Sequence, residues 1–401
     1  MLSNKTELLA KVLKANGYQT AYVGKWHLLG GNRVRPIPND MRYGFDTVLT
    51  NNCHVDFRPG KAFFWNEKGN KEYFDKWEVY GQTDQAMQLL DNFDKEKPFT
   101  LVVSWHPPHD WGNFKGSDGK LHYQYDTLEE LMELYQRDSI QVRPDLKSSP
   151  DRRRMYHGHM AMISGVDWAF GQLMDKLDKI GETENTLAIF SADPGNMLES
   201  MESTPSQKQY PHDYSARIPL MMRYPHKLKK GATTSLLIGT LDFMLTILGL
   251  LDIETQQDYD GINLATAILN GDEHTQKIIP TWVYSIEVNT NEDWRGVVTK
   301  DFSFAYGGTD EPDVSSLSNV LFDRKNDPYQ SNNPFWDTNY VQVKDSLKLL
   351  TQKWMKEYEY TFYTASDFKR VEPKEGWAQN RVKSPFELFR ENRKEGDFLR
   401  S

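Results

Sequence analysis

The sequence contains little cysteine and no long hydrophobic run. Its 401 residues include one cysteine, Cys53, which excludes an internal disulfide framework and a zinc site built from several cysteines. The most apolar stretch, 236–251, is interrupted by Asp242 and is shorter than the about 20 residues that span a bilayer. We therefore expect a buried helix over 236–251 and no membrane span. The N-terminus also lacks the apolar core of a signal peptide, because Lys11 and Lys14 interrupt it.

Negative charge exceeds positive charge. Lysine and arginine total 48 against 57 aspartates and glutamates, which gives a net charge of -9. This balance argues against a nucleic-acid partner and against a general basic membrane binder, while it permits a local cationic pocket. Apolar residues make up 38% of the chain and aromatic residues 13%. That content is enough to build a core and excludes wholesale disorder.

Strand and helix patterns alternate along the first two thirds of the chain. The buried β-prone runs are 19–24, 99–105, 186–191 and 218–225. Helical patterns separate them, and the longest of these is 155–177. After about residue 280, short strands and turns follow one another before a final helix. The order predicts an α/β domain over 1–280 and a small antiparallel α+β subdomain over 281–401.

Three of the predicted strands end in side chains that can bind anions or metal ions. These are Lys25 with His27, His106 with His109, and Asp193. In open α/β sheets, ligands bind beyond the carboxyl ends of strands, so we expect a cationic pocket for a sulfate or phosphate group. Asp193 suits a hard cation, and Lys208 could add a second ammonium. Taken singly, each residue is also compatible with a solvated stem or a turn former.

Several segments resemble the sulfatase family, in the order that this family requires. The segments are GYQTAYVGKWHLLGG (17–31), GFD (44–46), KPFTLVVSWHPPH (97–109), ENTLAIFSADPGN (184–196) and SARIPLMMRYP (215–225). The likeness covers nearly the whole chain. It implies the alkaline-phosphatase-like superfamily, with a large mixed sheet flanked by helices and a small C-terminal antiparallel subdomain. The implied activity is hydrolysis of a sulfuric ester, and the implied partner is a sulfated small molecule or carbohydrate.

The resemblance also implies roles for individual residues. Lys25 and His27 match the lysine and histidine of the GKWH motif, which bind sulfate and support the nucleophile. His109 matches a histidine that contacts the sulfate and assists the leaving group. Lys208 lies nine residues before the arginine of SARIP, the spacing of a second sulfate-binding lysine. Asp193 matches a calcium ligand, so the implied cofactor is Ca²⁺.

The sequence departs from the family pattern in its nucleophile and its metal ligands. In sulfatases, paired aspartate ligands and a C/S-x-P/A-x-R nucleophile motif precede GKWH, whereas only residues 1–24 precede Lys25 here. Cys53 follows GKWH and lacks the proline of that motif. Ser148 in SSPDR matches the C/S-x-P/A-x-R motif but follows GKWH instead of preceding it, so we interpret the match as chance. Pro194 stands where the family has another metal-binding side chain.

These departures predict an N-terminally truncated sulfatase that is weak or inactive as given. The absent first strand would leave the large sheet with an unpaired edge or a gap. The alternative is a non-catalytic sulfatase-like protein that binds sulfated ligands, which Pro194 favours. A phosphodiesterase or phosphonate hydrolase of the same superfamily is disfavoured by the GKWH and RIP patterns, and a purely structural or interaction protein is the least specific interpretation. The family is often periplasmic, secreted or lysosomal, and the sequence leaves the compartment open.

Overall fold

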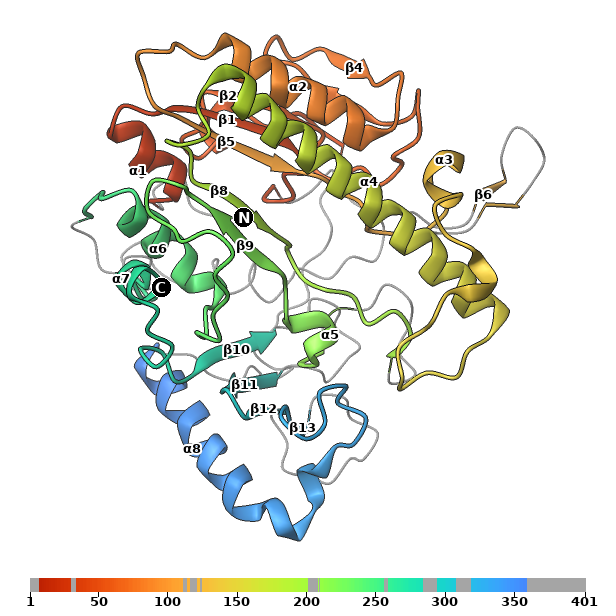
Figure 1. The fold of residues 1–401 in the computed structure, drawn as a ribbon, viewed down its shortest axis with the longest axis vertical. Helices are drawn as coiled ribbons and strands as arrows, with labels where there is room; N and C mark the ends of the chain where they lie inside the picture. The colour runs from red at the N-terminus through yellow and green to blue at the C-terminus, as the bar shows by residue number, and fades with distance from the viewer. Residues whose placement is uncertain are drawn as a thin grey trace, which may run out of the picture. The chain divides into compact units, whose positions relative to one another are not determined.

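The computed structural model (Figure 1) forms two compact units. It describes residues 7–29, 34–110, 114–115, 121–122, 125–200, 208, 210–255, 259–283, 294–307 and 319–358. The first unit comprises Met1–Val142, Lys147–Leu187 and Tyr224–His226. The second comprises Arg143–Leu146, Ala188–Arg223 and Lys227–Ser401.

The first unit is organised around a five-stranded mixed sheet with the order β4-β3-β2-β1-β5. Its strands are β1 (Gln19–Gly24), β2 (Thr47–Thr50), β3 (Phe63–Trp65), β4 (Lys71–Tyr73) and β5 (Phe99–Ser104). β1 pairs in parallel with both β2 and β5, whereas β3 and β4 extend the sheet in antiparallel pairs. The carboxyl ends of β2, β1 and β5 therefore lie at one edge of the sheet.

Helices flank this sheet. They are α1 (Leu9–Ala15), α2 (Glu78–Asn92), α3 (Glu129–Met132) and α4 (Pro150–Ile180), with short 3₁₀ turns η1 (Asn39–Met41) and η2 (Arg137–Ser139). A small hairpin joins β6 (Phe114–Lys115) to β7 (Leu121–His122). Figure 1 shows α2 and α4 running together across the sheet.

Alternation along β5 explains why α2 and α4 cover it. Phe99, Leu101 and Val103 pack into one apolar cluster with Leu90 of α2 and Leu173 of α4. Successive strand residues point to opposite faces, so these three side chains share the helix-covered face. Burial of this apolar surface is the term that holds the helices on the sheet.

The second unit begins with a two-stranded antiparallel sheet, β8 (Ala188–Ser191) and β9 (Leu220–Arg223). The intervening chain includes the single-turn helix α5 (Asp213–Ala216). A 3₁₀ turn η4 (Thr240–Asp242) leads into α6 (Phe243–Leu250), which is followed by α7 (Ala265–Asn270). Asp242 joins these segments, because its carboxylate accepts hydrogen bonds from the backbone N–H groups of Gly239 and Ile262.

A four-stranded antiparallel sheet closes the second unit. Its strands are β10 (Ile279–Val283), β11 (Trp294–Val298), β12 (Phe302–Gly307) and β13 (Val320–Asp323). Two 3₁₀ turns, η5 (Pro334–Trp336) and η6 (Thr338–Tyr340), precede the helix α8 (Val341–Glu357). Buried Trp354 of α8 fixes the helix on the sheet, because its indole N–H donates to the carbonyl of Gly296 at 3.0 Å.

The predicted fold class is confirmed: a mixed sheet flanked by helices accompanies a C-terminal antiparallel sheet with a helix. One local expectation is wrong: the helix expected over 236–251 is confined to η4 and α6. The domain boundary near residue 280 stays a prediction.

None of the helices in the described ranges combines the length and apolar character that a bilayer crossing requires.

His212 is a buried ionisable group of the second unit. It precedes α5, is 1% exposed, and its ring lies 5.0 Å from the Phe322 ring, centroid to centroid. Burial lowers the pKa of His212 to about 4, because a charged imidazolium is poorly solvated there. The folded protein therefore favours neutral His212.

This burial predicts an acid sensitivity of the fold. The unfolded histidine has an ordinary pKa of 6.5, so the contribution of neutral His212 is fully present above that pH. It is lost as the pH falls toward the folded pKa, by about 1.4 kcal/mol per pH unit. His212→Phe should flatten the fall in the free energy of unfolding between neutral and acid pH, measured by urea titration. The exposed His226→Phe is the control, and an unchanged slope in His212→Phe would contradict the prediction.

Candidate active site

The end of β1 is held tightly against the end of β5. Gly24 has φ +104°, and a Cβ there would lie 2.2 Å from the carbonyl oxygen of Ser104. Only glycine fits this position. The backbone N–H of the next residue, Lys25, donates to that same carbonyl at 2.8 Å. The backbone of Lys25 is therefore fixed beside the last residue of β5.

Trp26 anchors the GKWH segment, and its two neighbours remain accessible. The backbone N–H groups of Trp26 and His27 both donate to the carbonyl of Asn52, at 2.9 and 2.7 Å. The Trp26 ring is buried and stacks on Tyr43, with centroids 5.9 Å apart. Lys25 is half-buried and His27 is exposed. The tryptophan is thus a packing residue, while Lys25 and His27 can meet a ligand.

His109 lies in the turn that follows β5. Its backbone N–H donates to the carbonyl of His106 at 3.1 Å. Its Nδ1 lies 2.7 Å from the carbonyl oxygen of Asp110, which favours the proton on Nδ1. Nε2 is then the ring nitrogen that can gain and lose a proton. Lys25, His27 and His109 thus follow the carboxyl ends of two neighbouring parallel strands, as a ligand site in an open α/β sheet requires.

A buried polar cluster lies at the same strand ends. The side chains of Glu78 and His106 are both fully buried, and Glu78 Oε2 lies 3.3 Å from His106 Nδ1. The other carboxylate oxygen, Oε1, accepts from Asn51 Nδ2 at 2.9 Å and from Gln82 Nε2 at 3.0 Å. Cys53 is buried, and its thiol acts on the pKa of His106.

Opposing effects act on the pKa of His106. Burial lowers it and the ammonium of Lys25 lowers it further, whereas the charge of Glu78 and the nearby thiol of Cys53 raise it. The attraction to Glu78 wins, so the pKa of His106 is raised above its ordinary value. Burial prevails at the neighbouring His54, whose pKa is lowered despite the charges of Glu78 and Asp56.

The second unit carries Asp193 and Lys208, and one residue connects their loops. Asp193 is exposed just beyond β8. The N–H of Gly195 donates to the carbonyl of Ser215 at 2.7 Å, and the Ser215 hydroxyl donates to the carbonyl of Lys208. Ser215 therefore fixes the backbone of both predicted site segments.

Arg143 positions the loop after Asp193, and no sequence pattern indicated this role. Its guanidinium donates to the carbonyls of Asn196 and Met197 at 3.1 and 2.7 Å, and to the hydroxyl of Ser200 at 3.1 Å. It also lies 4.1 Å from the ring centroid of Tyr214. Nothing in the local pattern around Arg143 indicates these contacts, because all the partners lie far along the chain.

Ser148 has a structural role in the first unit. It precedes α4, and its hydroxyl accepts from the Arg153 guanidinium at 2.8 Å. The adjacent Ser149 caps the helix by accepting from the N–H of Arg152, and Pro150 occupies the first helical position. The SSPDR letters thus match those of a helix start, which agrees with the interpretation of the motif as chance.

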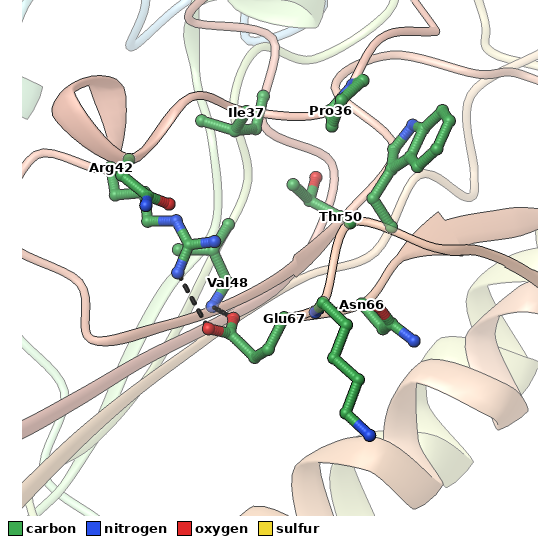
Figure 2. A pocket seen from close by; sticks show the side chains of 11 residues that line it. Pro36, Ile37, Arg42, Val48, Thr50, Asn66 and Glu67 are labelled. Carbon is green, nitrogen blue, oxygen red and sulfur yellow. Dashed lines mark hydrogen bonds and ion pairs between the residues drawn. The ribbon is translucent and has the colours of Figure 1, made fainter.

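A pocket of about 240 Å³ lies between β2, β3 and the segment around η1 (Figure 2). Arg42 and Glu67 form an ion pair on its wall at 2.8 Å, and Glu67 also accepts from the backbone N–H of Val48. Trp65 lines the pocket, and its indole N–H donates to the carbonyl of Val34 at 3.0 Å. Lys68, also in the lining, is exposed. An aromatic ring with a few polar groups is typical of small-ligand sites.

Comparisons with protein families and known proteins show what this chain is similar to. A family model described as Sulfatase matches residues 2–253, and one described as N-sulphoglucosamine sulphohydrolase, C-terminal, matches 204–357. An ulvan-active sulfatase from Formosa agariphila is 28% identical over 374 residues, covering 88% of this chain and 69% of that protein.

Two solved structures share the fold. The yidJ protein of Bacteroides fragilis has a TM-score of 0.75 at 22% identity, covering 89% of this chain and 78% of its own. A structure in complex with its substrate D-glucosamine-2-N,6-O-disulfate has a TM-score of 0.70 at 22% identity, covering 90% and 83%. At this identity the two structures show a shared fold. The chain belongs to the sulfatase family, the sulfuric ester hydrolases.

The family generally depends on a metal ion, and the described residues do not fit such a site. They contain no group of three or more histidine, cysteine, aspartate or glutamate side chains placed to hold a metal. Asp193 is the predicted ligand among them, and the following residue, Pro194, has no ligating side chain. Calcium takes about six to eight oxygen ligands, so one carboxylate does not make up the site.

The close contact at Gly24 gives a stability prediction. Gly24→Ala places a methyl group against the Ser104 carbonyl at a positive φ, so we expect a loss of about 2–4 kcal/mol in the free energy of unfolding. Gly60→Ala is the matched control, because Gly60 has φ +71° with open space around its Cβ position. It should lose about 1 kcal/mol. Chemical denaturation measures both, and equal losses would show that the contact with Ser104 is unimportant.

Proposed function

We propose that this protein is a sulfuric ester hydrolase whose sulfate-binding residues in the first unit are Lys25, His27 and His109. The observation that carries the proposal is the hydrogen bond from Lys25 N–H to the Ser104 carbonyl. It fixes the lysine beside the strand whose following turn holds His109. Placing cationic and imidazole groups at neighbouring strand ends creates a local environment for a tetrahedral anion.

The proposed chemistry assigns a different task to each residue. The Lys25 ammonium binds sulfate oxygens and stabilises negative charge on them. His27 contributes a second nitrogen contact. His109, with Nδ1 turned to the Asp110 carbonyl, gives a proton from Nε2 to the alkoxide oxygen as a water molecule attacks sulfur and the S–O bond to the sugar breaks, which releases the alcohol and inorganic sulfate. In the second unit we propose Lys208 as a further sulfate-binding lysine.

The proposed metal is Ca²⁺, with Asp193 as one of its ligands. The support is the match of this residue to the family's calcium-binding aspartate and the oxygen chemistry of a carboxylate. Asp193 is exposed at the end of β8, where a ligand can reach it. Through Asp193 alone, binding should be weak, and no step above depends on the metal.

A sulfated carbohydrate is the proposed substrate class. A protein of the same fold was solved with a disulfated glucosamine as its substrate, and a sulfatase relative is named for its activity on ulvan. The pocket around Trp65 and Arg42 is of a size and chemistry to take a sugar ring. We therefore assign it as a candidate subsite for the sugar.

A non-catalytic sulfatase-like protein is the second candidate. Pro194 favours it, because a proline replaces a side chain that could bind metal. Both candidates predict binding of sulfated sugars, and only the hydrolase predicts release of inorganic sulfate.

Removing Lys25 should weaken sulfate binding. Lys25→Ala and His109→Ala should each reduce the affinity for glucosamine 6-sulfate by about tenfold, since a hydrogen bond to a charged group contributes about 1.5 kcal/mol or more. Isothermal titration calorimetry measures the affinity, and sulfate release from the same sugar measures hydrolysis. Lys14→Ala is the control, because exposed Lys14 pairs with Asp46. Equal affinity in Lys25→Ala and Lys14→Ala would contradict the assignment.

The subsite gives a separate prediction. Trp65→Ala removes a partly exposed ring from the pocket and should weaken binding of a sulfated disaccharide by about tenfold, while inorganic sulfate binds as before. Trp168→Ala serves as the control, because Trp168 is 50% exposed on α4. A parallel loss of inorganic sulfate in Trp65→Ala, or no loss of disaccharide, would show that the pocket is not a sugar subsite.

A further inference from the structure

The buried contact between Glu78 and His106 has no task in the chemistry described above. Glu78 is the first residue of α2, and its side chain is wholly shielded from water. A carboxylate at a helix N-terminus interacts favourably with the helix dipole. Asn51 and Gln82 occupy Oε1, which leaves Oε2 directed at the imidazole of His106.

The charge on Glu78 requires a counter-charge. An ionised carboxylate taken out of water is unfavourable unless it is paired and hydrogen-bonded. His106 is the cation-forming group within 4 Å of it, at 3.3 Å. The raised pKa of His106 agrees with a carboxylate–imidazolium pair. The Phe57 ring stacks on His106 with centroids 5.4 Å apart, so the imidazole is held from a third side.

Several ionisable groups face this pair from the elements around it. Lys25 follows β1 and repels the imidazolium, while Cys53 follows β2 and raises the pKa of His106. His54 and Asp56 lie in the same segment after β2 and interact electrostatically with each other, and Glu78 and His106 both act on His54. The attraction to Glu78 outweighs both burial and the repulsion from Lys25, so the pKa of His106 is raised.

The pair is connected to His109 through the backbone. His106 and His109 bracket two consecutive prolines, and the N–H of His109 donates to the carbonyl of His106 at 3.1 Å. Proline fixes φ in both intervening residues, so the turn has little freedom once His106 is held. Anchoring the His106 ring therefore restricts where His109 can lie.

We propose that Glu78 is a positioning residue for sulfate binding: by pairing with His106 it fixes the turn that presents His109. This inference rests on the proposed function. Replacing Glu78 by glutamine removes one negative charge. His106 then loses the proton that this charge stabilised, which removes one positive charge. The net charge near Lys25 is therefore unchanged. A change in sulfate affinity would then report geometry rather than a weaker positive field.

The test is Glu78→Gln in the full chain, with inorganic sulfate as the probe. NMR titration of ¹³C-labelled histidine rings measures protonation of His106, and calorimetry measures sulfate affinity at neutral pH. We expect His106 to titrate above pH 6.5 in the native sequence and below it in Glu78→Gln, where burial and Lys25 outweigh the remaining effect of Cys53. Sulfate affinity should fall by about tenfold. Asp84→Asn, which removes an exposed carboxylate on the same helix, should alter neither measurement.

The outcomes separate this inference from the proposed function. If His106 titrates identically in both proteins, the pair does not exist and the inference is overturned. If His106 titrates lower and sulfate binds as before, the positioning role is overturned. If the native sequence itself binds no sulfate, the proposed function fails, and the histidine titration still decides whether the pair exists.

Should Glu78→Gln not fold, Glu78→Asp retains the charge at a longer distance. It should give intermediate shifts in both measurements, and unchanged sulfate affinity with a lowered His106 titration would again overturn the positioning role.

Discussion

The parallel pairing of β1 with β5 is the constraint on which the candidate site depends. Gly24 lies opposite Ser104 in the register, and the two backbones approach so closely that no side chain fits between them. The ladder continues one residue beyond β1 through the N–H of Lys25. The backbone of Lys25 is therefore fixed, although its side chain is long and flexible. A fixed backbone reduces the conformational entropy that the proposed sulfate contact of Lys25 would lose on binding.

The buried pair of Glu78 and His106 is better explained by positioning than by stability. Removing two charges from water costs about as much as their mutual attraction returns, and apolar replacements are often as stable. The proposed positioning role gives this pair an effect that an apolar pair would not have. Here it lies at the carboxyl ends of β1, β2 and β5, one turn from His109, where orientation matters more than stability.

Local patterns in the sequence predicted what local forces determine. The β-prone apolar run 99–105 predicted β5, and the residues that follow the predicted strands placed Lys25, His27 and His109 at strand ends. The limits of α2 could not be predicted this way, because its first residue is a buried glutamate whose partners, Asn51 and His106, lie far away in sequence. The role of Arg143 could not be predicted either, because its partners are also distant in sequence. Side chains that act through long-range contacts leave no periodic signal.

The overall charge of the protein limits how a sulfated ligand can bind. A net charge of -9 repels a polyanion at long range, but salt screens this repulsion beyond about 8 Å at physiological ionic strength. Inside that distance, individual contacts decide the binding energy. For the proposed sulfate site, selectivity in an acidic protein would come from the positions of its cationic groups rather than from long-range attraction. The backbone of Lys25 is fixed through Ser104 and that of His109 through His106, which suits the proposed site.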